Sequence, residues 1–313
     1  AVQITVGQMD NSFGLRGDLC FGSWDWLRPN NWLYGGEGLT FSSYDENGLG
    51  IELTPVEGLK VALAMPLNTT APDAYKAFGN SNIAAAYTID GIGTIKAGFD
   101  GQYAADGDAK KYGTIEGAFD LTGIDKLYVT VGAAFTLANS DYWDGAKAKD
   151  YATWYAKQTW KDETDEQKAA KYADYVYGNI IGNTMLKAAL GVSYGITESF
   201  KLSADFALGL FNDKIADDPA ISFGVGASYG VTDALTVVGD VRMLLPNNDC
   251  DPTLSFLVGL NGSVGSNAQL GIGFQGIVGL GDAAYGNNGL QVVKPTAYDK
   301  FVFAVPVRAS FSF

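Results

Sequence analysis

Residues 185–210 read MLKAALGVSYGITESFKLSADFALGL and contain two stretches in which every second residue is apolar. In the first stretch, Leu190 and Tyr194 belong to the apolar set, whereas Lys187 and Ser193 belong to the intervening set. A period of two is that of a β-strand, whose successive side chains point to opposite faces. The stretch therefore predicts two strands, each with one apolar face and one small or polar face.

The same alternation recurs in much of the chain. Further alternating segments are 221–229, 235–243, 254–260, 270–274 and 301–313. Several strands continue for about ten residues, the length that a tilted strand needs to cross a bilayer, whereas strands of soluble sheets are usually about five or six. The pattern predicts an all-β fold, a transmembrane β-barrel with a polar lumen, rather than a soluble β-sandwich.

Short turns alternate with longer polar stretches. The predicted turns are Pro55–Gly58, Asp90–Gly93, Thr122–Asp125, Thr197–Ser199, Thr232–Ala234 and Gly265–Asn267. The longer stretches are Asn68–Ser81, Ala104–Lys111, Asn139–Asn183, Asn212–Pro219, Pro246–Pro252 and Gly281–Asp299. Short periplasmic turns and long extracellular loops are typical of an antiparallel up-and-down barrel in an outer membrane. We expect one domain over residues 1–313 with about sixteen strands, fourteen or eighteen remaining open.

The first part of the chain alternates less evenly. Residues 1–8 and 19–27 predict strands, and Asn47-Gly48 between 39–41 and 49–53 predicts a hairpin turn. The aromatic residues of this part, which predict either a membrane-interface girdle or the core of a small soluble lobe, are Trp24, Trp26, Trp32 and Tyr34.

The C-terminal segment ends on aromatic residues, Phe311 and Phe313. It resembles the terminal assembly signal of bacterial outer-membrane β-barrel proteins of the porin type, although that signal often has Gly where this chain has Arg308. The resemblance implies the barrel assembly machinery as a partner, the bacterial cell outer membrane with its lipid as the location, and a homotrimer. The first residues, Ala1–Ile4, carry no basic or apolar leader, as in a mature chain whose signal peptide has been removed, although many cytoplasmic chains also begin so.

The composition excludes several function classes. The chain has 313 residues, no histidine and a net charge of −14. Without histidine, most hydrolase and metalloenzyme mechanisms lose their central residue, so we expect no enzyme, no cofactor and no metal. An acidic chain also lacks the basic footprint of a nucleic-acid-binding protein.

Two features of the loops leave alternatives open. Cys20 and Cys250 both fall near the expected extracellular end, where they form a disulfide or remain two free thiols. The run 247–251 offers oxygen ligands for Ca²⁺ but lacks a recognised spacing, which favours a polar turn.

If the apolar set faces lipid, the charged residues of the other set face the lumen. These predicted pore-lining residues are Glu52, Lys60, Lys96, Asp100, Glu116, Asp120, Lys126, Lys187, Lys201, Asp205, Asp240, Arg242 and Arg308. Seven are basic and six acidic, so the wall is nearly neutral and the acidic excess belongs to loops and turns. Such charges either pair across strands and stabilise the wall or select among permeating ions.

The stretch 139–183 is a long loop insertion with two predicted helical pieces. Its candidate constriction residues are Tyr151, Trp154, Tyr155, Asp162, Glu163, Asp165 and Glu166. Folded inward, the loop narrows the pore; folded outward, its aromatic residues pack on neighbouring loops or on another protomer.

A barrel of about sixteen strands is too wide for its wall side chains to fill, which leaves an aqueous channel. We therefore expect passive diffusion of ions and small hydrophilic solutes, with a weak preference for cations that the acidic mouth attracts. The alternatives are a structural or adhesive surface-array barrel and a plugged, substrate-specific transporter.

Overall fold

The computed structural model describes residues 1–8, 47–66, 79–146, 184–245 except 214 and 216, 252–280 except 266, and 301–311. These residues form fifteen strands in one sheet and one helix. The elements are β1 (Val2–Gln8), β2 (Asn47–Val56), β3 (Leu59–Pro66), β4 (Asn82–Ile89), β5 (Gly93–Asp106), β6 (Ala109–Ile124), β7 (Leu127–Ala138), α2 (Ser140–Ala146), β8 (Leu186–Gly195), β9 (Phe200–Leu210), β10 (Ala220–Thr232), β11 (Leu235–Leu245), β12 (Thr253–Val264), β13 (Ala268–Gly279), β14 (Phe301–Ala304) and β15 (Val307–Phe311).

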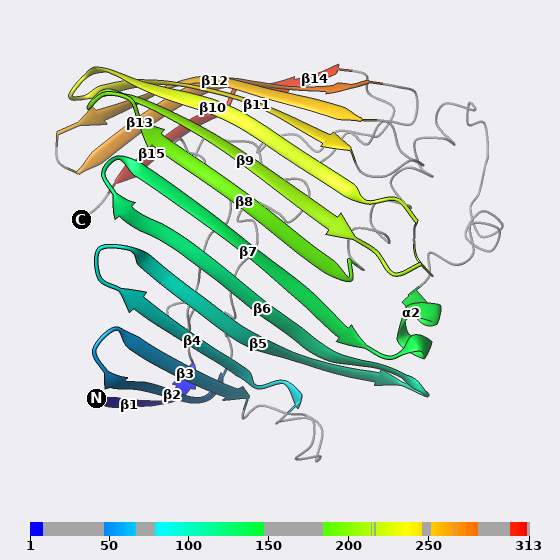
Figure 1. The fold of residues 1–313 in the computed structure, drawn as a ribbon. Helices are drawn as coiled ribbons and strands as arrows, with labels where there is room; N and C mark the ends of the chain where they lie inside the picture. Colours follow the sequence, from blue (N-terminus) through cyan, green and yellow to red (C-terminus); the bar gives the residue numbers. More distant parts are fainter. Residues whose placement is uncertain are drawn as a thin grey trace, which may run out of the picture.

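The sheet is an antiparallel meander in which each strand from β1 to β13 pairs with the next. Both β14 and β15 pair with β13, so they share the last position of the sheet. Figure 1 shows the strands curving around a common axis, with both chain ends at the edge that carries the short turns. The predicted up-and-down order of antiparallel strands is confirmed. Among the described residues no ladder joins β1 to β14 or β15, so the curved sheet is not closed into a barrel.

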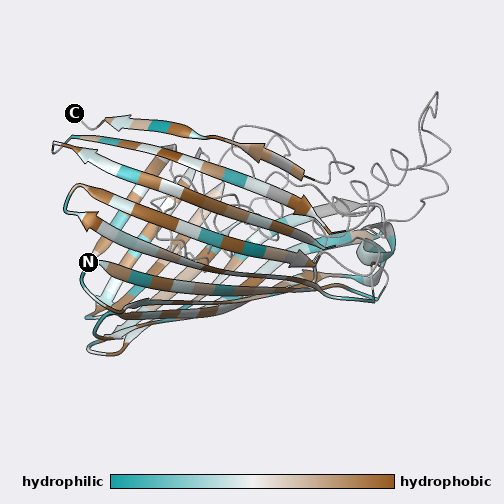
Figure 2. Cartoon of the chain, turned by 90° about the horizontal axis from the view of Figure 1, so that it is seen from above, coloured by the Kyte–Doolittle hydropathy of each residue, from teal (hydrophilic) through white to brown (hydrophobic). Residues whose placement is uncertain are grey.

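The outer face of the sheet exposes large apolar side chains. Ile4 is 64% exposed, Val258 59% and Phe303 56%, and apolar and polar residues alternate along the strands in Figure 2. A soluble monomer rarely exposes a large contiguous apolar surface. This band is the lipid-facing band that the alternation predicts.

The six predicted short turns are confirmed, and all of them join neighbouring strands at the same edge of the sheet. The turn between β2 and β3 requires glycine at Gly58, because its φ is +79° and an added Cβ would lie 2.6 Å from the carbonyl oxygen of Thr88. Within the described residues no helix is long and apolar enough to cross a membrane.

Two local predictions are wrong. Residues 104–111 are not a long loop, because β5 and β6 stay paired as far as Asp106 and Ala109. Their polar composition had indicated a loop, yet a hairpin that rises above the lipid needs no apolar face. Asn47 and Gly48 do not form a hairpin turn either: they begin β2, where Asn47 pairs with Gln8 of β1.

The strand predicted at 19–27 and the segment 39–41 lie outside the described residues, as do Trp24, Trp26, Trp32 and Tyr34. Because β1 pairs directly with β2, no strand stands between these two in the sheet. The first pair of strands therefore differs from the predicted order, in which residues 9–46 supplied the intervening strands.

Helix α2 begins the predicted 139–183 insertion and is held by Asn139. The Asn139 Oδ1 accepts hydrogen bonds from the backbone N–H of Tyr142 and of Lys110, both at 2.9 Å. The Asn139 side-chain amide donates to the carbonyl of Asp108 at 2.7 Å. One side chain thus caps the helix and ties it to the tip of the β5–β6 hairpin.

Candidate functional site

Most charged residues of the strands belong to the set that alternates with the outward-facing apolar residues. Of the thirteen predicted pore-lining residues, twelve lie on strands, in the set that alternates with the exposed apolar residues. Asp205, for example, is 6% exposed, whereas its neighbour Phe206 on β9 is 41% exposed on the outer face. Lys126 instead occupies the β6–β7 turn, with a φ of +59°.

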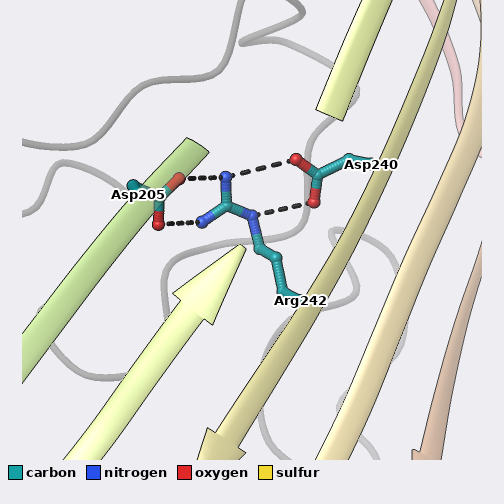
Figure 3. Close-up of polar contacts among 3 residues, drawn as sticks. All are labelled: Asp205, Asp240 and Arg242. Carbon is teal, nitrogen blue, oxygen red and sulfur yellow. Dashed lines mark hydrogen bonds and ion pairs between the residues drawn. The ribbon is translucent and has the colours of Figure 1, made fainter. Parts of the chain in front are cut away.

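The most buried charges of the inner face form a cluster of Asp205, Asp240 and Arg242. The two terminal nitrogens of Arg242 donate to the Asp205 carboxylate at 2.8 and 2.9 Å (Figure 3). The Arg242 Nε lies 2.8 Å from Asp240 Oδ1, and Nη2 donates to Asp240 Oδ2 at 3.2 Å. Each of the two carboxylates therefore contacts two nitrogens of the Arg242 guanidinium.

The glycine on the intervening strand makes this contact possible. In the register of the sheet, Gly224 on β10 stands between Asp205 on β9 and Arg242 on β11. A Cβ at Gly224 would lie 2.9 Å from Cγ and 3.1 Å from Cζ of Arg242. The arginine side chain thus crosses the backbone of β10 where no side chain obstructs it.

This cluster has one cation and two anions, and its members are 3–6% exposed. Removing one partner of a buried ion pair costs about 3–5 kcal/mol, because an uncompensated charge remains behind. The cluster therefore holds three neighbouring strands in one arrangement.

A second cluster lies on β5, β6 and β7. Lys96 Nζ lies 2.5 Å from Asp120 Oδ2, and the hydroxyl of Thr130 donates to the other oxygen of Asp120 at 2.5 Å. At the beginning of the sheet, Lys60 Nζ lies 2.9 Å from Glu52 Oε2. The Lys60 and Glu52 side chains are 38% and 23% exposed, so this pair is the more accessible of the two to solutes.

A third set of polar residues lies near the loop edge. The side-chain nitrogen of Gln102 donates to the Asp100 carboxylate, and Lys111 Nζ donates to the side-chain oxygen Oε1 of Gln102. The charge of Lys187 on β8 is attracted by Glu116 and repelled by Lys111. Sequence reasoning missed Gln102, Lys111 and Thr130 as partners: Lys111 fell in a predicted loop, and the other two are uncharged.

The two turns between β6 and β7 and between β8 and β9 are linked by Lys126 and Glu198, whose Nζ and Oε1 lie 2.5 Å apart. The hydrogen bond from Lys126 and its charge lower the pKa of Glu198, and the reverse interaction raises the pKa of Lys126. Beside this pair is a hollow of about 480 Å³ whose lining includes Tyr128, Ser193 and Lys201.

Several predicted site residues lie outside the described residues. They are Tyr151, Trp154, Tyr155, Asp162, Glu163, Asp165, Glu166, Cys20, Cys250 and Phe313, together with 247–251. Phe311 is described: it is 62% exposed and pairs with Ala268 at the turn edge of β13. The role of the C-terminal aromatic residues in assembly stays a prediction, as do the constriction and the disulfide.

Solved structures with a similar fold include an anion-selective porin from Comamonas acidovorans. It is 13% identical, with a TM-score of 0.52 over 89% of this chain and 92% of that one. The trimer form of OmpT of Vibrio cholerae is 15% identical, with a TM-score of 0.46 over 87% and 82%. A mutant of the Rh. blastica porin is 13% identical, with a TM-score of 0.46 over 90% and 81%.

No family model matches the chain, and no curated protein matches its sequence. The similarity to the Comamonas acidovorans porin is one of fold, spanning nearly the full length of both chains. The resemblance to porin-type outer-membrane barrels that the sequence pattern indicated is thus confirmed at the level of the fold.

Proposed function

We propose that this chain forms a water-filled channel across a bacterial outer membrane, through which ions and small hydrophilic solutes diffuse passively. The observation that carries the proposal is the division of one sheet into an apolar outer face and a charged inner face, with Ile4 and Val258 outside and Lys60 and Glu52 inside. Charged groups at partial exposure on a concave inner face suit an aqueous path and would be costly against lipid.

A weak preference for cations follows from where the charge lies. The twelve predicted wall residues that lie on strands are six basic and six acidic side chains, so the net charge of −14 comes from the rest of the chain, largely its loops and turns. Ion pairs such as Lys96–Asp120 neutralise much of the wall itself. The Comamonas acidovorans porin of similar fold is named as anion-selective. For this chain we propose the opposite preference, because its acidic loops and turns attract cations.

The direct test is conductance in a planar lipid bilayer. Purified, folded protein is expected to insert in discrete steps in the nanosiemens range, and a potassium chloride gradient is expected to give a reversal potential of the sign for cation preference. Folded protein that inserts into the bilayer without conducting contradicts the channel, and a reversal potential of the opposite sign contradicts only the selectivity.

The assembly is proposed to be a homotrimer, inserted by the barrel assembly machinery after signal-peptide removal. The OmpT structure named as a trimer form supports this only as an analogy of fold. Mass determination of the protein extracted in mild detergent tests it, with a monomeric mass as the contrary result. Catalysis is not part of the proposed function, because the chain has no histidine to serve as a general base.

A further inference from the structure

The hollow of about 480 Å³ beside the β6–β7 turn lies at the turn edge of the inner face, where residues of β6, β7, β8 and β9 line it. Its size is within the range of about 300–1,000 Å³ that is usual for small-molecule sites. The lining includes the hydroxyl-bearing residues Thr122, Tyr128 and Ser193 and the apolar residues Ile124 and Leu127. A few polar groups on a partly apolar wall are typical of a site for a small organic solute.

Lys201 in the lining of this hollow differs from the other basic residues of the wall. It lies on β9 in the same alternating set as Asp205, which places its side chain on the inner face. Lys60, Lys96 and Arg242 each contact a carboxylate, whereas no hydrogen bond or ion pair of the Lys201 amine occurs in the part of the chain that the structure describes. An amine without a fixed partner is able to give its charge and its hydrogen bonds to a ligand.

A glycine beside Lys201 leaves room for such a ligand. Gly195 on β8 stands opposite Lys201 in the register of the sheet. On its other side lies Lys126: the Gly195 N–H donates to the carbonyl of Lys126 at 2.9 Å, and an added Cβ at Gly195 would lie 3.4 Å from the Cβ of Lys126. All three residues line the hollow. Because Lys126 is already paired with Glu198, Lys201 is the cation that remains for a ligand.

Two buried serine hydroxyls lie next to this amine. Ser193 on β8 lines the hollow and is 4% exposed, and none of the described residues forms a hydrogen bond with its hydroxyl. Ser203 on β9, its partner in the register, is 7% exposed, and its Oγ is buried without a hydrogen-bond partner. Buried hydroxyls rarely stay unpaired, which indicates a bound group at this place. Ser193 is a diagonal neighbour of Lys201 across the two strands, so one group can contact both side chains.

We propose that this hollow binds the carboxylate of a small organic solute, with Lys201 Nζ and the Ser193 hydroxyl as its hydrogen-bond donors. An ionised carboxylate only accepts hydrogen bonds, which suits two donors that have no other partner. A single negative charge is preferred over two, because the exposed carboxylates of Asp125 and Glu198 lie beside the hollow and repel a second one. The site goes beyond the proposed channel, and binding to it does not depend on conductance.

Binding of 4-fluorobenzoate to the folded, detergent-solubilised chain, followed by fluorine NMR against a sample of detergent alone, tests the site. We expect saturable binding, with a dissociation constant that rises at least about fivefold in Lys201→Gln and about threefold in Ser193→Ala. Lys201→Arg keeps the charge and is expected to retain binding. Lys60→Gln is the matched control, because it removes an inner-face cation outside the hollow and is expected to leave the constant unchanged. Equal effects of Lys201→Gln and Lys60→Gln, or binding that does not saturate, overturn the proposal.

Competition in the parent chain tests the class of ligand and needs no variant. Near neutral pH and at constant ionic strength, acetate is expected to displace the probe at lower concentrations than succinate or inorganic phosphate, which carry more negative charge. Displacement by phosphate or succinate at lower concentrations than acetate overturns the assignment to a monocarboxylate. Both measurements record binding and no current, so a chain that binds the probe without conducting contradicts only the channel, and a chain that conducts without binding it contradicts only the site.

Discussion

The side chain of Arg242 on β11 crosses the backbone of Gly224 on β10 to reach a carboxylate on β9. Arg242 and Asp205 are therefore paired although their strands are not adjacent. The residue between them in the sheet, Gly224, has no side chain. The pairing of Arg242 with Asp205 therefore depends on the glycine as well as on the two charges.

Replacing that glycine tests the crossing. In Gly224→Ala the new methyl group would lie 2.9 Å from Cγ of Arg242, so the arginine must move away from Asp205. We expect a loss of about 1–3 kcal/mol in the free energy of unfolding, as for other overpacked sites. Urea unfolding in lipid vesicles measures the loss. Gly239→Ala is the matched control, because its nearest contact would be 3.9 Å away; equal effects of the two substitutions would refute the crossing.

Removing the cation of the cluster is expected to cost more than crowding it. Arg242→Met leaves Asp205 and Asp240 buried and facing each other, and the expected loss of unfolding free energy is about 3–5 kcal/mol. Adding Asp205→Asn and Asp240→Asn to the same chain removes both anions and is expected to recover a large part of that loss. A triple variant no more stable than Arg242→Met would show that packing, and not charge, sets the stability.

The link between Lys126 and Glu198 gives stability that depends on pH. Because the folded pKa of Glu198 is lowered, its contribution is complete above the unfolded pKa of the carboxyl and is lost as pH falls through the folded pKa. Because the folded pKa of Lys126 is raised, its contribution is complete below the unfolded pKa of the amine and is lost as pH rises through the folded value.

Glu198→Gln is therefore expected to lower the unfolding midpoint slightly near neutral pH, and the difference from the parent chain is expected to shrink at both acidic and strongly alkaline pH. Both groups are exposed, so added salt is expected to reduce the difference as well. A difference that stays constant over the whole pH range would mean that the substitution acts through something other than this pair.

The strands were predictable where alternation was clean. For β8 and β9, the residues of the apolar set, such as Leu190 and Phe206, are those exposed on the outer face. The prediction is wrong at the tip of the β5–β6 hairpin. Its polar residues indicate a loop, yet the two strands stay paired as far as Asp106 and Ala109. A polar paired tip is expected of a barrel hairpin that is longer than the lipid is thick. The predicted order of the first strands is also wrong. Residues 9–46 form a long segment rich in aromatic residues, which indicates strands, yet β1 and β2 are adjacent in the sheet.

The sequence predicts which side of the sheet the charged residues occupy, but it does not predict which residues they contact. Alternation gave the side of the sheet on which Lys96 and Asp120 lie, because that depends only on parity along the strand. It did not give their partners, since contacts between strands depend on register, and Thr130 carries no charge to mark it. The crossing from Arg242 to Asp205 needs the register of three strands at once.

The partly exposed pair of Lys60 and Glu52, on β3 and β2, gives the most direct test of whether wall charges affect ion selectivity. Lys60→Glu replaces the cation of a partly exposed pair by an anion beside Glu52, which changes the lumen charge by two units. Because a fixed anion raises the local concentration of cations, we expect the reversal potential in a potassium chloride gradient to shift toward cation preference. Lys60→Gln is expected to give about half of the shift. The control is Asp233→Asn in the β10–β11 turn, which alters a charge at the mouth and leaves the wall unchanged. Val258→Glu would not serve, because it places a charge against lipid. If Lys60→Glu shifts the potential no more than Asp233→Asn does, ions do not pass close to β2 and β3, and the charges at the mouth alone set the selectivity.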